Sequence, residues 1–230
     1  GAYCICSPRT HRSLTASLAR ESQMDVYVPD YRLAPEHSYP AALDDAIKTY
    51  CWLLEEEHFK PDDIIIMGDS AGGGLALAAL LKIKAMGLPN PLTAVVISPW
   101  TDLTVSGDSA LSNPEKDPIL SVDKAREWAK WYAGDTPLED PFVSPVFGDL
   151  SGLPPILIQV GTDEILLSDA VRFAVFAAMK DSDVTLTIEE DMSHVWHFFW
   201  QYIPEAKNAI KDIAQFLDKQ IDEWQTTHPE

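Results

Sequence analysis

The sequence is short of positive charge. Its 230 residues hold 17 Lys and Arg against 36 Asp and Glu, a formal net charge of -19. Basic residues form no cluster larger than isolated pairs, which argues against nucleic acid and anionic membrane surfaces as partners. Apolar runs all fall well short of the ~20 residues that a bilayer-spanning helix needs, so we expect no stable membrane association.

Cysteine is also scarce. Cys4, Cys6 and Cys51 are an odd number of thiols, with no second pair to complete a four-ligand zinc site. This pattern is typical of reduced thiols in a cytosolic protein, so we predict a cytoplasmic location. A Cys-x-Cys pair can bind metal, but we interpret Cys4 and Cys6 as small apolar side chains on an extended segment and predict no metal site.

Apolar residues are plentiful, at 46% of the chain, and we predict a single domain over 1–230 with a substantial core. Short apolar runs alternate with helical patterns, as in a mostly parallel sheet with helices on both faces. The predicted strands are 26–28, 64–67, 94–97, 156–160 and 184–188. The segment 103–155 interrupts this alternation, and we interpret it as a lid or cap insertion with one helix at 123–132.

The pentapeptide Gly68-Asp69-Ser70-Ala71-Gly72 follows the apolar run 64–67 and precedes a helical pattern of small residues. A tight strand-to-helix turn of this kind exposes a serine hydroxyl beside free backbone N–H groups, which makes Ser70 a candidate nucleophile. We expect glycine on both sides because a Cβ at either place would clash in the turn. We interpret Asp69 as a structural hydrogen-bond partner.

An activated serine needs a base, and the base needs an orienting carboxylate. In a parallel sheet both should follow later strands, in the order acid then histidine. Asp163 follows the strand 156–160 and is our predicted acid; His194 follows 184–188 and is our predicted base. Three alternatives stay open. Asp163 could cap a helix, Glu164 could be the acid, and His197 could be the base. The remaining histidines read as surface or structural residues: His11, His37, His58 and His228.

Three strings carry a family resemblance: Tyr-Arg-Leu-Ala-Pro-Glu-His at 31–37, Gly-Asp-Ser-Ala-Gly-Gly at 68–73 and Ser-Pro-Trp-Thr-Asp at 98–102. Together with the later acid and histidine, they closely resemble the hormone-sensitive-lipase-like branch of the α/β-hydrolases, the bacterial family IV esterases. The resemblance implies the α/β-hydrolase fold and a carboxylesterase for short- to medium-chain acyl esters, without metal or organic cofactor.

In that family the 31–37 string is structural, so we interpret Arg32, Glu36 and His37 as a buried polar network. The family also has a His-Gly-Gly-Gly-like loop whose last two residues donate N–H groups to the oxyanion. In this sequence they align with Gly1 and Ala2, and the third donor aligns with Ala71.

The family's histidine and first glycine, its earlier strands and its N-terminal cap helices have no counterpart in this sequence. One of those strands would lie between the predicted strands 26–28 and 64–67. We therefore expect the sequence to be part of a longer protein, and direct pairing of those two strands would contradict this.

Aromatic residues near the predicted site are candidates for the walls of a substrate pocket, with core packing as the alternative for each. They are Tyr3, Trp100, Trp128 and Trp131.

The predicted reaction is ester hydrolysis through an acyl-enzyme on Ser70, and amide or lactone hydrolysis would use the same machinery. A non-catalytic receptor is a rival, because the plant gibberellin receptors resemble this family but have lost the histidine; His194 is retained here. A lyase without an acyl-enzyme is disfavoured because the serine is retained. The strand 184–188 is last in order, so we expect it at the sheet edge, where it could pair with a second copy in a homodimer.

Overall fold

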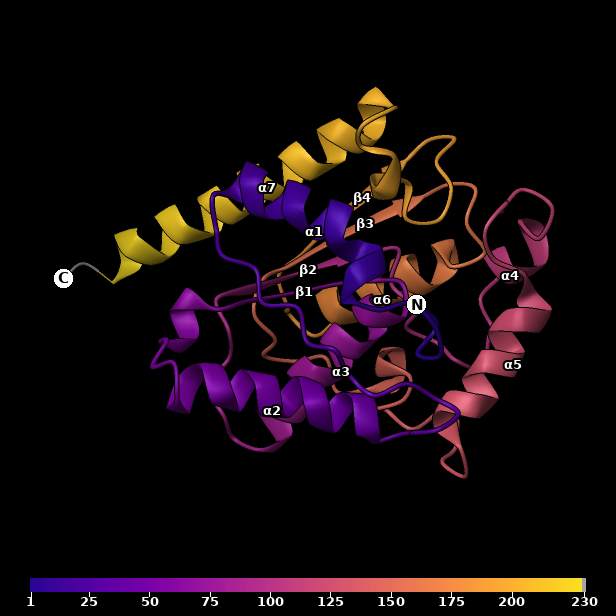
Figure 1. The fold of residues 1–230 in the computed structure, drawn as a ribbon, viewed down its shortest axis with the longest axis horizontal. Helices are drawn as coiled ribbons and strands as arrows, with labels where there is room; N and C mark the ends of the chain where they lie inside the picture. Colours follow the sequence, from indigo (N-terminus) through magenta and orange to yellow (C-terminus); the bar gives the residue numbers. More distant parts are fainter. Residues whose placement is uncertain (229–230) are drawn as a thin grey trace. The chain divides into compact units, whose positions relative to one another are not determined.

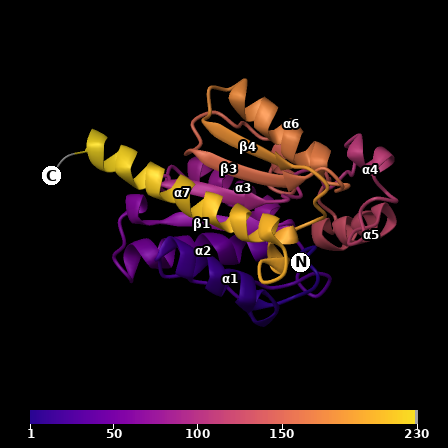
Figure 2. The same cartoon turned by 90° about the horizontal axis from the view of Figure 1, so that it is seen from above.

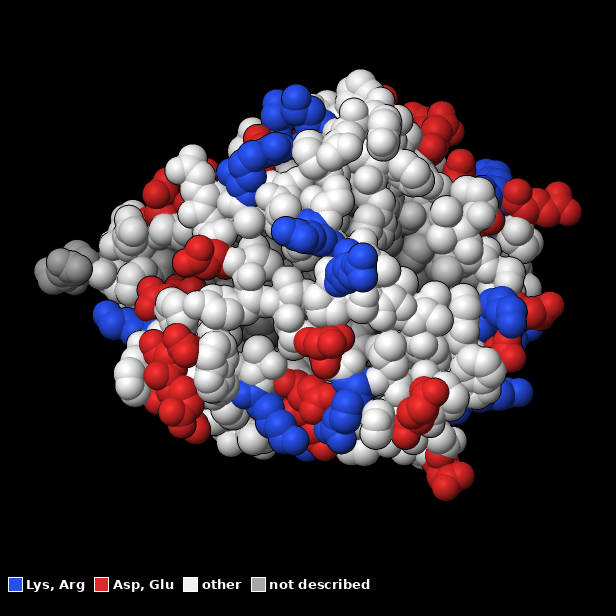
Figure 3. Space-filling view, in the orientation of Figure 1, with Lys and Arg blue, Asp and Glu red and all other residues white. Residues whose placement is uncertain are grey.

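The computed structural model describes residues 1–228, which form two compact units. The first unit holds Gly1–Ile5 and Pro29–Val195, and the second holds Cys6–Val28 and the chain from Trp196 onward. Within residues 1–228, no helix combines the length and the apolar character needed to cross a membrane. Acidic and basic side chains are interspersed on the face drawn in Figure 3.

A parallel sheet of four strands is the centre of the first unit (Figure 1). Its strands are β1 (Ile65–Asp69), β2 (Thr93–Ile97), β3 (Ile156–Gly161) and β4 (Val184–Glu189). They lie side by side in chain order, so β1 and β4 are the two edges (Figure 2). Every residue of β2 and β3 is buried, which explains why both read as continuous apolar runs. These four predicted strands and the edge position of β4 are confirmed.

The first unit also contains helices, some of which pack along these strands. They are α2 (Ala41–Glu55), α3 (Ala71–Ala85), α4 (Ser109–Ser112), α5 (Val122–Ala133) and α6 (Leu167–Ala178), with the 3-10 turns η1 (Pro61–Asp63) and η2 (Pro145–Phe147). Helix α3 contacts β1, β2 and α2, and α6 contacts β3 and β4. Since α3 is buried on nearly all sides, small and apolar residues occupy almost its whole length.

The long segment between β2 and β3 carries α4, α5 and η2. Both of its ends belong to the core, because Leu103 and Val143 are fully buried and Leu150 is 2% exposed. Much of this segment is thus an integral part of the packed interior.

The second unit is helical. It consists of α1 (Pro8–Ser22), η3 (Trp196–Phe199) and α7 (Pro204–Thr227), and α1 contacts both of the others. Helix α7 buries Ala206, Ile210, Ile213 and Leu217, which recur every three or four residues. This spacing places the apolar side chains on one face of the helix.

The predicted strand at 26–28 is wrong. The structure assigns no strand there, and Val26, Tyr27 and Val28 are 41–47% exposed. In the described sheet β1 pairs with β2 alone, so the run 26–28 joins no ladder. A short apolar run forms a stable strand only when it pairs with a neighbouring strand.

The interpretation of 31–37 as a buried network is also wrong, because Arg32, Glu36 and His37 are exposed. Arg32 instead pairs with Asp45 of α2 through its Nε and Nη2 atoms, at distances of 2.8–3.2 Å. Hydrogen bonds from Arg32 hold the pKa of the Asp45 carboxyl below its ordinary value. The arginine therefore ties this segment to α2 at the surface.

Candidate active site

Ser70 lies in the sharp turn between β1 and α3, as the sequence predicts. Its backbone has φ 55° and ψ -121°, a conformation that is strained for any residue except glycine. Two hydrogen bonds hold the turn: Ser70 N–H donates to the Ile97 carbonyl at 2.8 Å, and Trp100 N–H donates to the Ser70 carbonyl at 3.0 Å. The end of β2 therefore holds the nucleophile's backbone from both sides.

The glycines around this turn differ in whether a Cβ would fit at their positions. A Cβ on Gly68 would lie 2.1 Å from the Gly72 carbonyl oxygen, and one on Gly74 would lie 2.1 Å from the Trp100 carbonyl oxygen. A Cβ on Gly72 would meet nothing within 4 Å. The predicted steric need is thus confirmed at Gly68 and wrong at Gly72; the second crowded glycine is Gly74, where α3 passes the Trp100 backbone.

Three side chains form one hydrogen-bonded line at the carboxyl ends of the strands. His194 Nε2 lies 2.9 Å from Ser70 Oγ, and His194 Nδ1 lies 2.9 Å from Glu164 Oε2. Each of the three residues is at least nine-tenths buried. The predicted contact between Ser70 and His194 is confirmed. His197 is fully buried in η3, with its ring 4.1 Å from that of Trp196.

The carboxylate on His194 belongs to Glu164, so the prediction of Asp163 as the acid is wrong in this geometry. The chain leaves β3 in a turn that buries Glu164 completely and leaves Asp163 partly exposed. Asp163 contributes its backbone N–H, which donates to the Met192 carbonyl at 3.1 Å. The helix-cap alternative fails too, because α6 begins only at Leu167.

Glu164 has a second set of partners on its other oxygen. Ser98 Oγ donates to Glu164 Oε1 at 2.7 Å, and Gly161 N–H donates to the same atom at 2.7 Å. Ser98 Oγ also accepts a hydrogen bond from Val195 N–H at 3.1 Å. From the sequence, Ser98 was noted only within the Ser-Pro-Trp-Thr-Asp string, and no role was predicted for it. Its position directly after β2, next to the nucleophile's strand, was the available signal.

The segment between β2 and β3 also supports the loop that follows β3 and carries Glu164. Asn113 Nδ2 donates to the carbonyls of Thr162 and Glu164, both at 2.9 Å. Asp117 accepts from Ile165 N–H at 3.0 Å. These contacts fix the backbone on both sides of the Glu164 carboxylate, and no spacing in the sequence indicated them.

The predicted oxyanion donors lie in two places. Ala71 is fully buried at the first position of α3, where backbone N–H groups lack helical partners. Ala2 is buried with φ 51°, and the Gly1 nitrogen donates to the Ile5 carbonyl at 2.8 Å. Ala2 and Ala71 belong to the same apolar cluster. Their role as donors stays a prediction.

The aromatic residues predicted as pocket walls have different environments. Tyr3 is buried and stacks on Tyr132 with the ring centroids 3.7 Å apart, and burial raises the pKa of Tyr3 well above its ordinary value. Trp100 is buried, with its Nε1 donating to the Asp102 carbonyl at 3.1 Å. Tyr3 and Trp100 are therefore core residues. Trp128 is half-buried and Trp131 is 41% exposed, so a role of these two residues as pocket walls stays a prediction.

A charged cluster lies beneath the segment that follows β2. Asp169 Oδ2 accepts from Thr101 N–H at 2.9 Å and from Asp102 N–H at 2.8 Å, and burial raises the pKa of Asp169 to about 8. Burial also acts to raise the pKa of Asp102, but hydrogen bonds from Ser106, Thr104 and Arg172 outweigh it and lower that pKa. The cluster anchors the segment without touching the three site residues.

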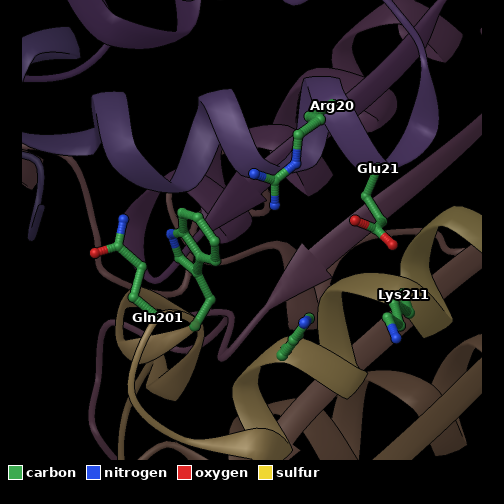
Figure 4. A pocket seen from close by; sticks show the side chains of 6 residues that line it. Arg20, Glu21, Gln201 and Lys211 are labelled. Atoms are coloured by element: carbon green, nitrogen blue, oxygen red, sulfur yellow. The ribbon is translucent and has the colours of Figure 1, made fainter.

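One hollow of about 620 Å³ lies within the second unit (Figure 4). It is lined by Arg20, Glu21, Trp200, Gln201, Lys207 and Lys211. The Arg20 guanidinium lies 4.9 Å from the centre of the Trp200 ring. None of the three hydrogen-bonded site residues lines this hollow, and it is not the site of their chemistry. Within residues 1–228, no group of three His, Cys, Asp or Glu could hold a metal ion.

Comparisons with known proteins agree on one family. A family model described as "alpha/beta hydrolase fold" matches residues 1–198. The chain is 39% identical over 217 residues to an acetyl-hydrolase of Streptomyces hygroscopicus, covering 94% of this chain and 72% of the relative. It is 43% identical over 217 residues to an esterase of Acinetobacter venetianus, covering 94% of this chain and 71% of the relative. A solved esterase from the bacterial hormone-sensitive lipase family superposes with a TM-score of 0.94 at 42% identity, over 96% of this chain and 74% of that one.

Proposed function

We propose that this chain, which belongs to the hormone-sensitive-lipase-like branch of the α/β-hydrolase family, hydrolyses carboxylic esters with Ser70 as its nucleophile. One observation carries the proposal: the line from Ser70 Oγ through the His194 ring to Glu164, with 2.9 Å at each step. A hydroxyl, an imidazole and a carboxylate in this order are the parts of an acyl-transfer triad.

In the first half-reaction Ser70 Oγ attacks the acyl carbon while His194 Nε2 takes its proton. Glu164 accepts the hydrogen bond from His194 Nδ1–H, which fixes the ring's tautomer and stabilises its charged form. His194 then gives the proton to the leaving alcohol, and the acyl group stays on Ser70.

In the second half-reaction His194 takes a proton from water, and the hydroxide attacks the acyl carbon. The proton returns to Ser70 as the carboxylic acid leaves. The same groups serve both halves, so no metal or organic cofactor has a part in the scheme.

The oxyanion that forms in each half needs backbone donors. We assign Ala71 N–H, at the start of α3, together with the N–H groups of Gly1 and Ala2. A helix start supports this role because its free N–H groups and its dipole favour negative charge. Loss of one such donor typically costs about 3 to 4 kcal/mol of transition-state stabilisation.

We assign short- to medium-chain acyl esters as substrates. The acetyl-hydrolase name of one relative supports a small acyl group, and the esterase name of another supports an ester as the substrate. Within the segment 103–155, the part that carries α5 with Trp128 and Trp131 is our candidate for a lid and for part of the acyl pocket. Amides and lactones would use the same triad, and a substrate panel separates the three classes.

The test is Ser70→Ala assayed on a short aryl ester. With the nucleophile gone, we expect turnover to fall by roughly 10⁴-fold or more. Unchanged turnover would reject the proposal and favour a binding protein on the same fold. A panel of acyl chain lengths, amides and lactones with the unmodified chain then assigns the substrate.

Assembly and location complete the proposal. The edge strand β4 supports a homodimer in which β4 pairs with its copy, because an edge strand presents unpaired backbone groups. The cysteines Cys4, Cys6 and Cys51 are free thiols, which supports a cytoplasmic location.

A further inference from the structure

One short segment contacts Ser70, Glu164 and the residue that follows His194. Residues 97–100, which end β2 and follow it, hold the Ser70 backbone through the Ile97 carbonyl and the Trp100 N–H. The same segment reaches the Glu164 carboxylate and the residue after His194 through the single side chain of Ser98. The triad residues come from three different strand ends, and this segment is where their supports meet.

The geometry of Ser98 is specific for this contact. The residue is fully buried, and its backbone has φ 47°. Its N–H donates to the Gln159 carbonyl at 2.7 Å, which ties it to β3. A positive φ is costly for a residue with a side chain, so the surrounding structure must hold Ser98 in it. In this conformation the hydroxyl donates to Glu164 Oε1 and accepts from Val195 N–H.

We propose that Ser98 is a positioning residue that fixes the Glu164 carboxylate and the loop carrying His194 in a single arrangement. The proposal rests on the esterase function assigned above. Glu164 Oε1 receives hydrogen bonds from Ser98 and from Gly161 N–H, which leaves Oε2 directed at His194 Nδ1. Removing the hydroxyl takes one of two donors from Oε1 and leaves Val195 N–H without its acceptor.

The test compares Ser98→Ala with the unmodified chain on a short aryl ester. A hydrogen bond to a buried charged group is typically worth about 1.5–3 kcal/mol, so we expect kcat to fall roughly 10- to 100-fold. Since Ser98 touches no substrate in the proposed scheme, we expect KM to stay within about twofold. Ser98→Cys keeps a weak donor and should give an intermediate kcat.

A matched control is Ser182→Ala. Ser182 is also a buried serine, its hydroxyl donates to the Leu150 carbonyl, and it lies just before β4 at the opposite end from the triad. We expect this variant to keep kcat within about twofold even if it unfolds at a lower temperature. A loss of kcat equal to that of Ser98→Ala would mean that any buried hydroxyl has the same effect, and it would overturn the proposal.

A second readout follows the His194 to Glu164 hydrogen bond directly. The Nδ1 proton of an imidazole bonded to a carboxylate gives a downfield proton NMR signal. We expect it to broaden or shift in Ser98→Ala, to be partly restored in Ser98→Cys and to be unchanged in Ser182→Ala. A Ser98→Ala variant with the unmodified kcat and signal overturns the proposal while leaving the esterase function intact.

Failure of the esterase function is a separate result. If the unmodified chain hydrolyses no ester, amide or lactone, the downfield proton NMR signal of His194 alone decides whether Ser98 positions the Glu164 carboxylate. Should Ser98→Ala fail to fold, Ser98→Cys decides in its place: a reduced kcat with unchanged KM supports the proposal, and an unchanged kcat and signal overturn it.

Discussion

Two carboxylates adjacent in the chain, Asp163 and Glu164, have different environments at the candidate site. Only Glu164 contacts His194, at 2.9 Å, while Asp163 is partly exposed. Because an amide at the acid position favours the wrong imidazole tautomer, we expect Glu164→Gln to lower kcat by about 10³- to 10⁴-fold. The matched Asp163→Asn should keep kcat within about threefold. Steady-state kinetics on one aryl ester measures both.

A reversal of these two effects would return the acid role to Asp163. Circular dichroism and thermal unfolding serve as the control, since both variants replace a carboxylate by an amide of the same size. The comparison is informative only where both variants remain folded at the assay temperature.

This pair also shows what could be predicted at the scale of residues. Ser70 and His194 were identifiable because each follows a strand in the order that the chemistry requires. The choice between Asp163 and Glu164 depends on the direction in which the chain turns after Gly161, where Gly161 N–H bonds Glu164 Oε1. That turn is set by tertiary contacts with Met192 and Asn113, which no local pattern records.

Among the elements, the turn from β1 into α3 depends on close backbone packing. A Cβ on Gly74 would lie 2.1 Å from the Trp100 carbonyl oxygen, so Gly74→Ala must shift the backbone. We expect it to lower the free energy of unfolding by about 1–3 kcal/mol or more. Gly72→Ala adds a Cβ in open space within a helix, where alanine is favoured over glycine by up to about 1 kcal/mol. Denaturant unfolding of both variants checks this.

Equal stability of the two variants would contradict the close approach of α3 to Trp100. Activity is not the readout here, because Gly72 lies two residues from the nucleophile.

The strands show where element prediction succeeds and where it stops. Buried parallel strands such as β2 and β3 read directly as apolar runs, and they were predicted to within one residue at each end. The run 26–28 is also apolar and forms no strand, because pairing depends on a neighbouring strand that composition does not reveal. Likewise, the family resemblance led to the prediction that Arg32 is buried, yet Arg32 pairs with Asp45 at the surface.

At the scale of the whole molecule, we expect the buried Asp169 to make the free energy of unfolding depend on pH. Its pKa in the folded chain is about 8, above its ordinary 3.8, so between these values the folded state holds a proton that the unfolded state has lost. The contribution of Asp169 to stability is therefore fully present below about pH 4 and decreases as the pH rises to about 8. Asp169→Asn is neutral throughout this range.

The measurement is the free energy of unfolding of both proteins from pH 4 to pH 8. We expect the unmodified chain to lose stability relative to Asp169→Asn across this window, and to run parallel to it above pH 8. A constant difference over the whole window would show that the carboxyl is already ionised at pH 4.

The assembly of the molecule gives a further prediction. If β4 pairs with its copy, light scattering should give a mass of about 51 kDa, twice the 25.5 kDa of one chain. Ile188 on β4 is 47% exposed, and a charge on an edge strand resists pairing, so Ile188→Lys should shift the mass toward one chain. A monomer mass for the unmodified chain at all concentrations would contradict the dimer.

The most direct test of the central claim is to trap the nucleophile. The chain is treated with an activated phosphonate ester that reacts with triad serines, and the label is located by peptide mass spectrometry as activity is followed. The line from Ser70 through His194 to Glu164 predicts one label per chain, on Ser70, with activity lost in proportion and with slow labelling in Glu164→Gln. A label on another residue, or full activity after Ser70 is labelled, would contradict the account.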